Sequence, residues 1–194
     1  MSARPPAARG LTAASRLALG LGLGLGLALA ACAGNSSADA GAADPARAGA
    51  ANPADRVPQD LRLTLERGPC FGTCPVYSLE IDATGAVRYL GERHVRVPGE
   101  VSDSIPAERV AALADQLRNS GFFDLADRYA YGEPNCPEYI ADLPSVTLTA
   151  RMDGRTKQVY ADYGCRPIPA AVTDLARAMD EAAGTARWTG VEEM

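Results

Sequence analysis

The sequence predicts an α+β domain in which an antiparallel sheet of about five strands carries two helices packed on one face. Three observations lead to this prediction. Apolar and polar residues alternate in two runs between residues 61 and 81, which is the period of half-buried strands. Two further alternating runs surround the turn dipeptide Asp153-Gly154 and indicate a β-hairpin. Apolar residues at helical spacing occur before and after this hairpin, so the order is strands, helix, hairpin, helix.

The first 31 residues have the features of a secretory signal. Three arginines precede an apolar run of Leu, Ala and Gly from Leu17 to Ala31, and no acidic residue occurs before Asp39. The run is too short for a membrane-spanning helix, and it ends in small residues, as cleaved export signals do. Its end, Leu29-Ala30-Ala31-Cys32, resembles the lipobox of bacterial lipoproteins, in which the signal is cut before a cysteine that then carries lipid.

This resemblance implies that Cys32 is the lipid-bearing N-terminus of the mature protein and attaches it to a membrane. Ordinary signal cleavage nearby is the alternative, and it would leave Cys32 as a spare thiol. Ala33, rather than an aspartate, follows the cysteine. By analogy with the lipoprotein sorting rule of two-membrane bacteria, this favours the periplasmic face of the outer membrane.

The sequence divides into a signal peptide at 1–31, a lipidated cysteine with a tether at 32–56, and one domain at 57–190. Residues 33–56 contain no large apolar side chain, so they cannot bury enough surface to offset the entropy of ordering them. We therefore expect a disordered tether with a root-mean-square span of about 25–30 Å. The remaining length is that of a single domain.

The mature chain is acidic. The full sequence has 19 basic and 24 acidic residues, and the signal removes three arginines and no acids, which leaves 16 against 24 and a net charge of −8. The sequence shows no basic cluster, and this composition argues against nucleic acid as a partner.

The first two predicted strands are joined by a crowded turn, Cys70-Phe71-Gly72-Thr73-Cys74-Pro75. Gly72 permits a backbone path that a Cβ atom would block, and Pro75 cannot continue a helix. We therefore expect two neighbouring strands with a constrained connection. The alternating apolar residues are Leu61, Leu63 and Leu65 before the turn, and Tyr77, Leu79 and Ile81 after it.

A third strand is predicted to begin at Val87, after the turn Ala83-Thr84-Gly85. Residues 94–97 are interpreted as its continuation or as a fourth strand, which Pro98-Gly99 ends.

The first predicted helix has Ser104 as its N-cap and Pro106 in its first turn. Its apolar residues fall at i, i+3, i+4 and i+7, and Gly121 is the expected stop. Phe122-Phe123 should then return to the core. The apolar stripe consists of Val110, Leu113, Ala114 and Leu117.

Residues 129–143 are predicted to form an irregular loop that is rich in tyrosine. The hairpin follows, with strands around 146–150 and 159–163. A second amphipathic helix then ends at Gly184. Its apolar stripe consists of Val172, Leu175, Ala176 and Met179.

Four cysteines remain once Cys32 carries lipid, and an even number in an exported chain indicates disulfide bonds. Three connectivities are possible, and we favour Cys70–Cys74 with Cys136–Cys165. Regular pairing in the hairpin places the position opposite Cys165 near Asp142, and the loop that carries Cys136 can fold onto that end. The chain-entropy estimate gives about 3.5 kcal/mol for the longer closure and about 2 kcal/mol for the shorter one.

A zinc site and a redox site are the alternatives to structural disulfides. Four sulfur ligands of zinc usually come as Cys-x-x-Cys pairs, whereas here three, 61 and 28 residues separate successive cysteines. A redox pair usually has two intervening residues at a helix N-terminus, where the dipole lowers a thiol pKa. Cys70 and Cys74 have three, and Pro75 leads into a strand. We therefore favour structural disulfides and expect neither a metal nor a cofactor.

Residues 63–79, Leu-Thr-Leu-Glu-Arg-Gly-Pro-Cys-Phe-Gly-Thr-Cys-Pro-Val-Tyr-Ser-Leu, resemble the signature of a bacterial family known only as a domain of unknown function. Its members are often predicted lipoproteins. The most specific part is Cys-Phe-Gly-Thr-Cys-Pro, and the resemblance extends from about residue 60 to Trp188. It implies one domain and carries no activity.

No catalytic residue is predicted. His94 is the single histidine, and no serine or cysteine has the context of a nucleophile beside it. Four carboxylates lie around the hairpin and in the loop before it, where such groups are usually solvated and a calcium site is the alternative. They are Glu133, Glu138, Asp142 and Asp162.

Tyrosines gather around the hairpin and its approach. Core packing explains most of them, whereas a binding surface requires several to be exposed together. Tyr160 and Tyr163 belong to the hairpin itself. The candidate binding loop consists of Phe71, Gly72, Thr73, Tyr129, Tyr131 and Tyr139.

The leading functional hypothesis is a non-enzymatic, lipid-anchored envelope domain that binds another envelope protein or a cell-wall component. Its contact with the membrane is through the N-terminal lipid. The alternative is an envelope thiol–disulfide oxidoreductase that uses Cys70 and Cys74.

Overall fold

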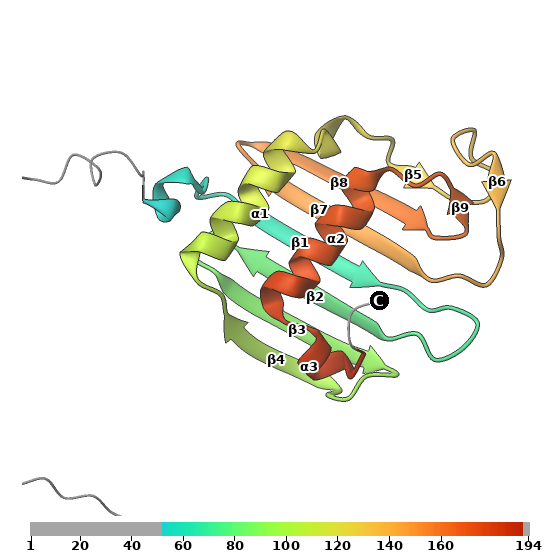
Figure 1. Cartoon of the computed structure of the whole chain (residues 1–194), viewed down its shortest axis with the longest axis horizontal. Helices are drawn as coiled ribbons and strands as arrows, with labels where there is room; N and C mark the ends of the chain where they lie inside the picture. Colours follow the sequence, from blue (N-terminus) through green and yellow to red (C-terminus); the bar gives the residue numbers. More distant parts are fainter. Residues whose placement is uncertain (1–51, 192–194) are drawn as a thin grey trace, which may run out of the picture. The chain divides into compact units, whose positions relative to one another are not determined.

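A seven-stranded sheet forms the main layer of the computed structural model, which describes residues 52–191 (Figure 1). The strand order is β4-β3-β2-β1-β7-β8-β5. Every neighbouring pair is antiparallel except β5 and β8, which are parallel. The strands are β1 (Arg62–Arg67), β2 (Val76–Asp82), β3 (Ala86–Arg93), β4 (Gly99–Ser104), β5 (Arg128–Tyr129), β7 (Ser145–Met152) and β8 (Arg155–Asp162).

Strand β1 lies in the middle of the sheet and brings the two halves of the domain together. Leu65 of β1 is opposite Leu79 of β2 on one side and Leu148 of β7 on the other. The first half continues outward as a meander through β3 and β4, and the predicted hairpin β7–β8 extends the other side. The hairpin expected around Asp153-Gly154 is therefore present, and it pairs with the first strand of the domain.

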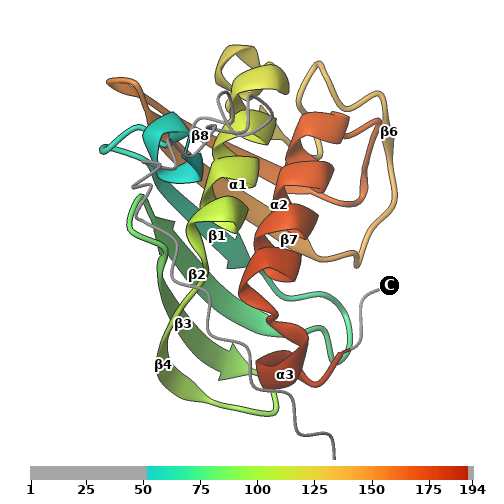
Figure 2. The ribbon, with the colours of Figure 1, turned by 60° about the vertical axis from the view of Figure 1, so that its left-hand side comes forward.

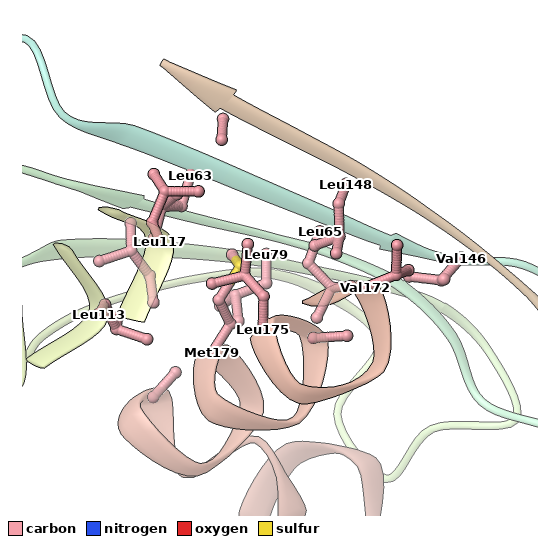
Figure 3. Close-up of a cluster of buried hydrophobic side chains, with 14 of the residues drawn as sticks. Leu63, Leu65, Leu79, Leu113, Leu117, Val146, Leu148, Val172, Leu175 and Met179 are labelled. Atoms are coloured by element: carbon pink, nitrogen blue, oxygen red, sulfur yellow. The ribbon is translucent and has the colours of Figure 1, made fainter. Parts of the chain in front are cut away.

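Two long helices, α1 (Ala107–Asn119) and α2 (Ala170–Ala183), cover one face of the sheet (Figures 1 and 2). The strand residues that face them alternate with polar residues that face away, and the buried set is almost wholly apolar. On the opposite face, the described strand residues are mostly polar and partly or fully exposed, as one face of an antiparallel sheet can be. Figure 3 shows the core from Leu63, Leu65, Leu79, Leu113, Leu117, Val146, Leu148, Val172, Leu175 and Met179.

The expected sheet of about five strands is too small, because the main sheet has seven within the described residues. The fourth strand is Gly99–Ser104, and not the segment 94–97. His94 has a positive φ of 56°, which turns the chain out of β3. The amide of Val97 then donates to the carbonyl of Trp188 at 2.8 Å, so this segment is bonded to the short helix α3 (Ala186–Thr189) rather than to a strand.

The other additional strands are very short. Strand β5 adds to the edge of β8 through Arg128 and Tyr129. A separate two-stranded ribbon joins β6 (Glu138–Tyr139) to β9 (Cys165–Arg166). Two-residue strands carry too few side chains to show a period of two, so the sequence pattern could not distinguish them from loop.

The helix ends follow the expected chemistry with one exception. Gly121 and Gly184 follow α1 and α2 with φ of 72° and 66°, a left-handed conformation that glycine adopts without strain. The N-cap of α1 is Pro106, however, and makes no side-chain cap hydrogen bond. Ser104 ends β4 instead of capping the helix, and Phe122 returns to the core in a 3-10 turn, η3 (Phe122–Asp124), as expected.

The domain begins slightly earlier than the predicted boundary at residue 57. Residues Pro53–Arg56 form a 3-10 turn, η2, and Arg56 donates to Asp115 of α1 at 2.8 Å. The last residues assigned to the tether therefore belong to the folded part. The predicted signal peptide, Cys32 and the rest of the tether lie outside the described residues. Within residues 52–191, no helix is long and apolar enough to cross a membrane.

Candidate binding site beside the Cys70–Cys74 turn

Both favoured cysteine pairs lie at disulfide distance. Cys70 and Cys74 have Cα atoms 5.7 Å apart in the connection between β1 and β2. Cys136 and Cys165 have Cα atoms 5.2 Å apart and tie the loop before β6 to β9. The β1–β2 connection, which holds the first pair, and the region of β6 and β9, which holds the second, lie at the same end of the sheet (Figure 1).

Arg67 is a charged residue at a core-facing position. The buried face of β1 carries Leu63 and Leu65, and the period of two places Arg67 next on that face. Strand β2 begins with Val76 and Tyr77. Tyr77 lies directly opposite Arg67 in the strand register. The two side chains therefore enter the same space from neighbouring strands, just inside the disulfide turn.

Asp180 of α2 meets both of them. It follows Met179 and lies eight residues after Val172, so it continues the buried stripe of the helix. Its carboxylate accepts hydrogen bonds from Arg67 Nη2 at 2.7 Å and from the Tyr77 hydroxyl at 2.6 Å. Thr185 Oγ1 donates a third at 3.0 Å. The charge of Asp180 is thus matched by one cation and its oxygens are supplied with three donors.

Tyr163, just after β8, completes the cluster. Its hydroxyl oxygen accepts a hydrogen bond from Arg67 Nη1 at 2.9 Å. The side chains of Arg67 and Asp180 are only 21% and 13% exposed. The pair is therefore partly desolvated, and each member depends on the other for compensation of its charge.

The electrostatics keep these groups in one protonation state. Burial of Tyr77, together with the charge of Asp180, raises the pKa of its hydroxyl well above the ordinary value. Burial alone would lower the pKa of Arg67, but the Asp180 carboxylate and the hydroxyls of Tyr163 and Tyr77 together raise it above the ordinary value. Tyr77 stays a neutral donor and Arg67 a cation throughout the physiological range.

A pocket of about 330 Å³ opens onto this cluster, and we call it the Arg67 pocket. Among the described residues that line it, Arg67 and Asp180 are the charged ones, and most of the remaining wall is apolar. The lining residues include Arg67, Pro75, Tyr77, Pro144, Tyr163 and Ala186. Cys74 also lines it, so the disulfide turn forms part of the wall.

A larger and more open pocket of about 720 Å³ lies beside the second cysteine pair. Its lining includes Cys165, Arg166 and Ile168, and it shares Tyr163 with the Arg67 pocket. Leu143 lines this pocket and Pro144 lines the other, so the two hollows are neighbours on either side of Tyr163.

Most of the predicted binding loop is exposed. Phe71 is 87% exposed, and Gly72 and Thr73 beside it are exposed as well. Tyr131 is 78% and Tyr139 37% exposed, and their ring centroids lie 5.1 Å apart. The Phe71 amide donates to the carbonyl of Asp142 at 3.1 Å, which joins the disulfide turn to the tyrosine-rich loop.

Tyr129 does not belong to this exposed set. Its side chain is only 8% exposed and packs in the core cluster. Its hydroxyl oxygen accepts a hydrogen bond from the Ala126 amide at 3.3 Å. Tyr129 faces inward because it lies in β5, and β5 pairs with the buried part of β8.

The carboxylates considered for calcium do not form one site. Asp162 accepts from the Tyr139 hydroxyl at 2.9 Å and from the Gly164 amide at 2.8 Å. Glu133 lies 3.4 Å from Arg128 Nε in an ion pair. Within residues 52–191, no group of three or more His, Cys, Asp or Glu residues is placed to hold a metal ion. His94 is exposed in the turn after β3.

The cluster around Asp180 was missed by the sequence reasoning, although a signal was present. The alternation that identified β1 places a cation, Arg67, on the buried face, and the stripe that identified α2 continues to Asp180. A charge at a core-facing position is rarely left without a partner. An arginine on one element and an aspartate on another, both at such positions, therefore predict a contact between them.

The comparison with protein families gives one result. A family model described as Domain of unknown function (DUF6438) matches residues 61–183. The match covers both cysteine pairs and the residues Arg67, Tyr77, Tyr163 and Asp180. The predicted resemblance to a domain of unknown function is confirmed at that level. A search of curated proteins finds no match.

Proposed function

The chain belongs to the family described as Domain of unknown function (DUF6438), and we propose that its domain is a non-catalytic binding module of a lipid-anchored envelope protein. The Arg67 pocket and the exposed aromatic residues beside it form the binding surface. The partner is another envelope protein, and the Cys32 lipid holds the module at the membrane.

The main support for this proposal is that the charged and polar side chains of the pocket are hydrogen-bonded to one another. Asp180 accepts three hydrogen bonds and its charge is balanced by Arg67, so most of its lone pairs are already engaged within the protein. The raised pKa of Tyr77 and the permanent charge of Arg67 exclude both as bases near neutral pH. An arrangement of this kind favours binding over chemistry.

The surroundings also favour a binding role. A pocket of about 330 Å³ is at the lower end of the size of ligand sites, which are mostly apolar with a few placed polar groups. Phe71 and Tyr131 are exposed, and Phe71 belongs to the turn whose Cys74 lines the pocket. Large exposed aromatic side chains are common anchors in protein interfaces.

Export and lipid anchoring rest on the sequence features of residues 1–33. The two cysteine pairs at disulfide distance support an oxidising compartment, since such bonds persist mainly in exported proteins. The order of residues at Leu29-Ala30-Ala31-Cys32 supports lipidation at Cys32. Ala33 after it supports the periplasmic face of the outer membrane.

Site-specific photo-crosslinking in intact cells tests the binding role. A benzophenone amino acid is placed at Phe71, where an exposed aromatic side chain already stands. The control carries the benzophenone amino acid at position 90 instead. Leu90 is 38% exposed and lies on the other face of the sheet. We expect one discrete envelope-protein adduct from position 71 and none from position 90. Adducts of equal yield from both positions, or none from position 71, would contradict the proposal.

An envelope thiol–disulfide oxidoreductase is the second candidate. It is favoured by the position of Cys70 and Cys74, which are only half-buried in a turn whose Phe71, Gly72 and Thr73 are exposed. A partner thiol can therefore approach the pair. Against this role, Cys74 is followed by Pro75 and strand β2, so the helix N-terminus that usually stabilises a catalytic thiolate is missing from this part of the described chain.

A further inference from the structure

We propose that β4 is an interface through which two copies of this chain pair antiparallel and join their main sheets across a two-fold axis. This edge contributes no residue to the described lining of the Arg67 pocket, and the dimer does not depend on the binding role proposed above. Three features of β4 support it: which of its backbone groups are free, which residues limit that free stretch, and which side chains the pairing brings together.

The backbone groups of β4 are divided between β3 and the open edge of the sheet. The Ile105 amide donates to the carbonyl of Gly85 at 2.8 Å, and these two residues continue the register of β4 with β3. Hydrogen-bonded pairs alternate along an antiparallel ladder, so the odd-numbered residues of β4 bond to β3 and the even-numbered residues point their amides and carbonyls outward. Strand β4 is first in the strand order, and within residues 52–191 no strand lies beyond it (Figure 1).

The free stretch is confined to Glu100 and Ser102. The outward amide of Ser104 is already bonded to the Asp103 carboxylate at 2.8 Å. At the other end, Pro98 has no amide proton to donate. In the described part of the chain, no other strand and no side chain bonds to the amides of Glu100 and Ser102. Two amides and their two carbonyls therefore remain, and they are arranged symmetrically about the residue between them.

A second β4 satisfies all of these groups when Val101 meets its own copy on the two-fold axis. Glu100 of each copy then exchanges both hydrogen bonds with Ser102 of the other copy, which gives four backbone bonds in the dimer. Val101 occupies the non-hydrogen-bonded position between them, where facing Cα atoms are about 4.5 Å apart and side chains are closest. Val101 is half-buried and β-branched, and such residues pack well across strands.

The same register keeps the acidic side chains apart. It places Glu100 opposite a serine of the other copy, whose hydroxyl can donate to the carboxylate. It places Asp103, which is paired with Arg187 of α3, opposite Gly99, where a Cβ atom would meet no other described atom within 4 Å. A shift that brings Glu100 opposite its own copy is disfavoured by like charge. Direct pairing of Glu100 with Asp103 would join an outward residue to an inward one, and the ladder does not allow it.

The opposite edge of the main sheet is covered instead. Strand β5 and the segment before it run along β8, and the Tyr160 amide donates to the Asp127 carbonyl at 2.9 Å. Ion pairs of Arg155 with Asp124 and of Lys157 with Asp127 hold the same segment against the start of β8. Within residues 52–191, β4 is therefore the open edge of this sheet, and one open edge per chain gives closed pairs rather than filaments.

Disulfide trapping in intact cells tests the dimer with an otherwise unaltered chain. Val101→Cys places a thiol on the two-fold axis, where facing Cα atoms lie within the range that a disulfide spans. Ser102→Cys lies about 7–8 Å from its copy in this register, and Thr156→Cys is an exposed control on β8. After brief oxidation with copper phenanthroline, we expect rapid formation of a two-chain species from position 101. We expect about fivefold slower formation from position 102 and none from position 156.

Charge variants at position 102 test the register without moving the thiol. In the dimer this position faces Glu100 of the other copy, whereas within one chain it faces Arg88 of β3. In the Val101→Cys background, Ser102→Lys should raise the initial rate of trapping about fivefold and Ser102→Asp should lower it by a similar factor, since each dimer contains two such pairs. The effect on thermal unfolding has the opposite sign, because a lysine here repels Arg88 and an aspartate attracts it.

Absence of the two-chain species from position 101, in a variant present at the wild-type level, would overturn the proposal. Faster trapping from position 102 than from position 101 would do so too, as would equal rates for Ser102→Lys and Ser102→Asp. An adduct of position 101 with a different protein would assign the edge to a foreign strand instead. Native mass spectrometry of the unsubstituted chain, extracted in detergent, gives a readout that no substitution affects, and a monomer alone would also overturn the dimer. Adduct mass separates this interface from the binding role, because a dimer has twice the mass of the chain.

Discussion

Arg67 and Asp180 are 113 residues apart in the chain, and a hydrogen bond of 2.7 Å joins the guanidinium of one to the carboxylate of the other. This bond connects the end of the central strand β1 to the last turn of α2. Both residues line the Arg67 pocket, as does Cys74 of the Cys70–Cys74 turn. The same contact thus closes the sheet onto its covering helix and positions the donors of the proposed site.

The first prediction concerns the stability of this pair. Asp180→Asn keeps the shape of the side chain but leaves Arg67 without its counter-charge, and we expect a loss of about 2 kcal/mol in the free energy of unfolding. This loss is smaller than the loss expected for a fully buried ion pair, because both side chains retain some exposure. Urea denaturation measures it.

The control for this prediction lies on the same helix. Asp174 pairs with Arg177 at 3.5 Å, and both side chains are more than half exposed. Asp174→Asn should therefore cost about 0.5 kcal/mol or less. Equal losses for the two variants would show that Asp180 contributes no more than a surface charge.

The second prediction uses the raised pKa of Tyr77. An unfolded tyrosine ionises near pH 10, whereas folded Tyr77 keeps its proton to higher pH. The stabilisation from this group is complete below about pH 10 and is lost as pH rises further, since the unfolded state then binds fewer protons. Tyr77→Phe should flatten the alkaline fall in stability by up to about 1.4 kcal/mol per pH unit.

Denaturation between pH 9 and 11.5 measures that slope. Tyr131→Phe is the matched control, because Tyr131 is an exposed tyrosine of the same domain, and its slope should equal that of the wild type. Parallel curves for wild type and Tyr77→Phe would contradict the link between burial and the shifted pKa.

The third prediction concerns Tyr89, whose side chain is 1% exposed. Its hydroxyl is buried without a hydrogen-bond partner in the described part of the chain, while its ring packs on Tyr77 and Trp188 with centroids 5.5 and 4.9 Å away. Tyr89→Phe keeps the ring and removes the unpaired group, so it should stabilise the domain by about 1 kcal/mol. Tyr77→Phe at neutral pH should do the opposite, because that hydroxyl is bonded to Asp180. A destabilised Tyr89→Phe would indicate a bound water or partner at this hydroxyl.

The parts of the fold that the sequence predicts are those with long, regular patterns. The hairpin β7–β8 has eight residues in each strand and a turn dipeptide, and each long helix has a full apolar stripe. The segment 94–97 was assigned wrongly because its backbone amides donate to carbonyls of α3 rather than to a neighbouring strand. That contact depends on a helix about ninety residues later in the chain, and no local pattern encodes it.

The candidate site was predictable only in part. The exposure of Phe71 and Tyr131 was predictable because both lie in loops. The inward position of Tyr129 depends on the pairing of β5 with β8. The Arg67 pocket depends on β1, β2, α2 and α3, which meet through tertiary packing. The strand and helix periods place Arg67 and Asp180 on buried faces, but only the structure shows that those faces meet.

The fourth prediction concerns the membrane anchor. Cys32 lies outside the described residues, and its role rests on the Leu29-Ala30-Ala31-Cys32 sequence. Cys32→Ser should release the protein from membranes into the soluble envelope fraction, because a lipid chain can no longer be attached. Fractionation followed by a carbonate wash measures this. Equal membrane retention of the variant and the wild type would contradict the lipoprotein interpretation.

The fifth prediction separates structural from catalytic roles of Cys70 and Cys74. The pair closes the connection whose two ends, Arg67 and Tyr77, lie opposite each other in the strand register. A structural bond here should resist mild reductant in the folded protein, and the double variant Cys70→Ala, Cys74→Ala should lose about 2 kcal/mol of stability. The crosslink from Phe71 should survive at low temperature in that variant.

A redox catalyst predicts the reverse pattern, with easy reduction, a thiolate already present near neutral pH, and little loss of stability in the double variant. Free-thiol counts in glutathione buffers of stepped potential, measured beside thermal unfolding of the double variant, distinguish the two. Cys136 and Cys165 provide the internal reference, because they close a longer loop and Cys165 is 1% exposed. If Cys70–Cys74 is half-reduced at the potential of known disulfide exchangers while Cys136–Cys165 stays oxidised, the binding-module proposal gives way to the oxidoreductase.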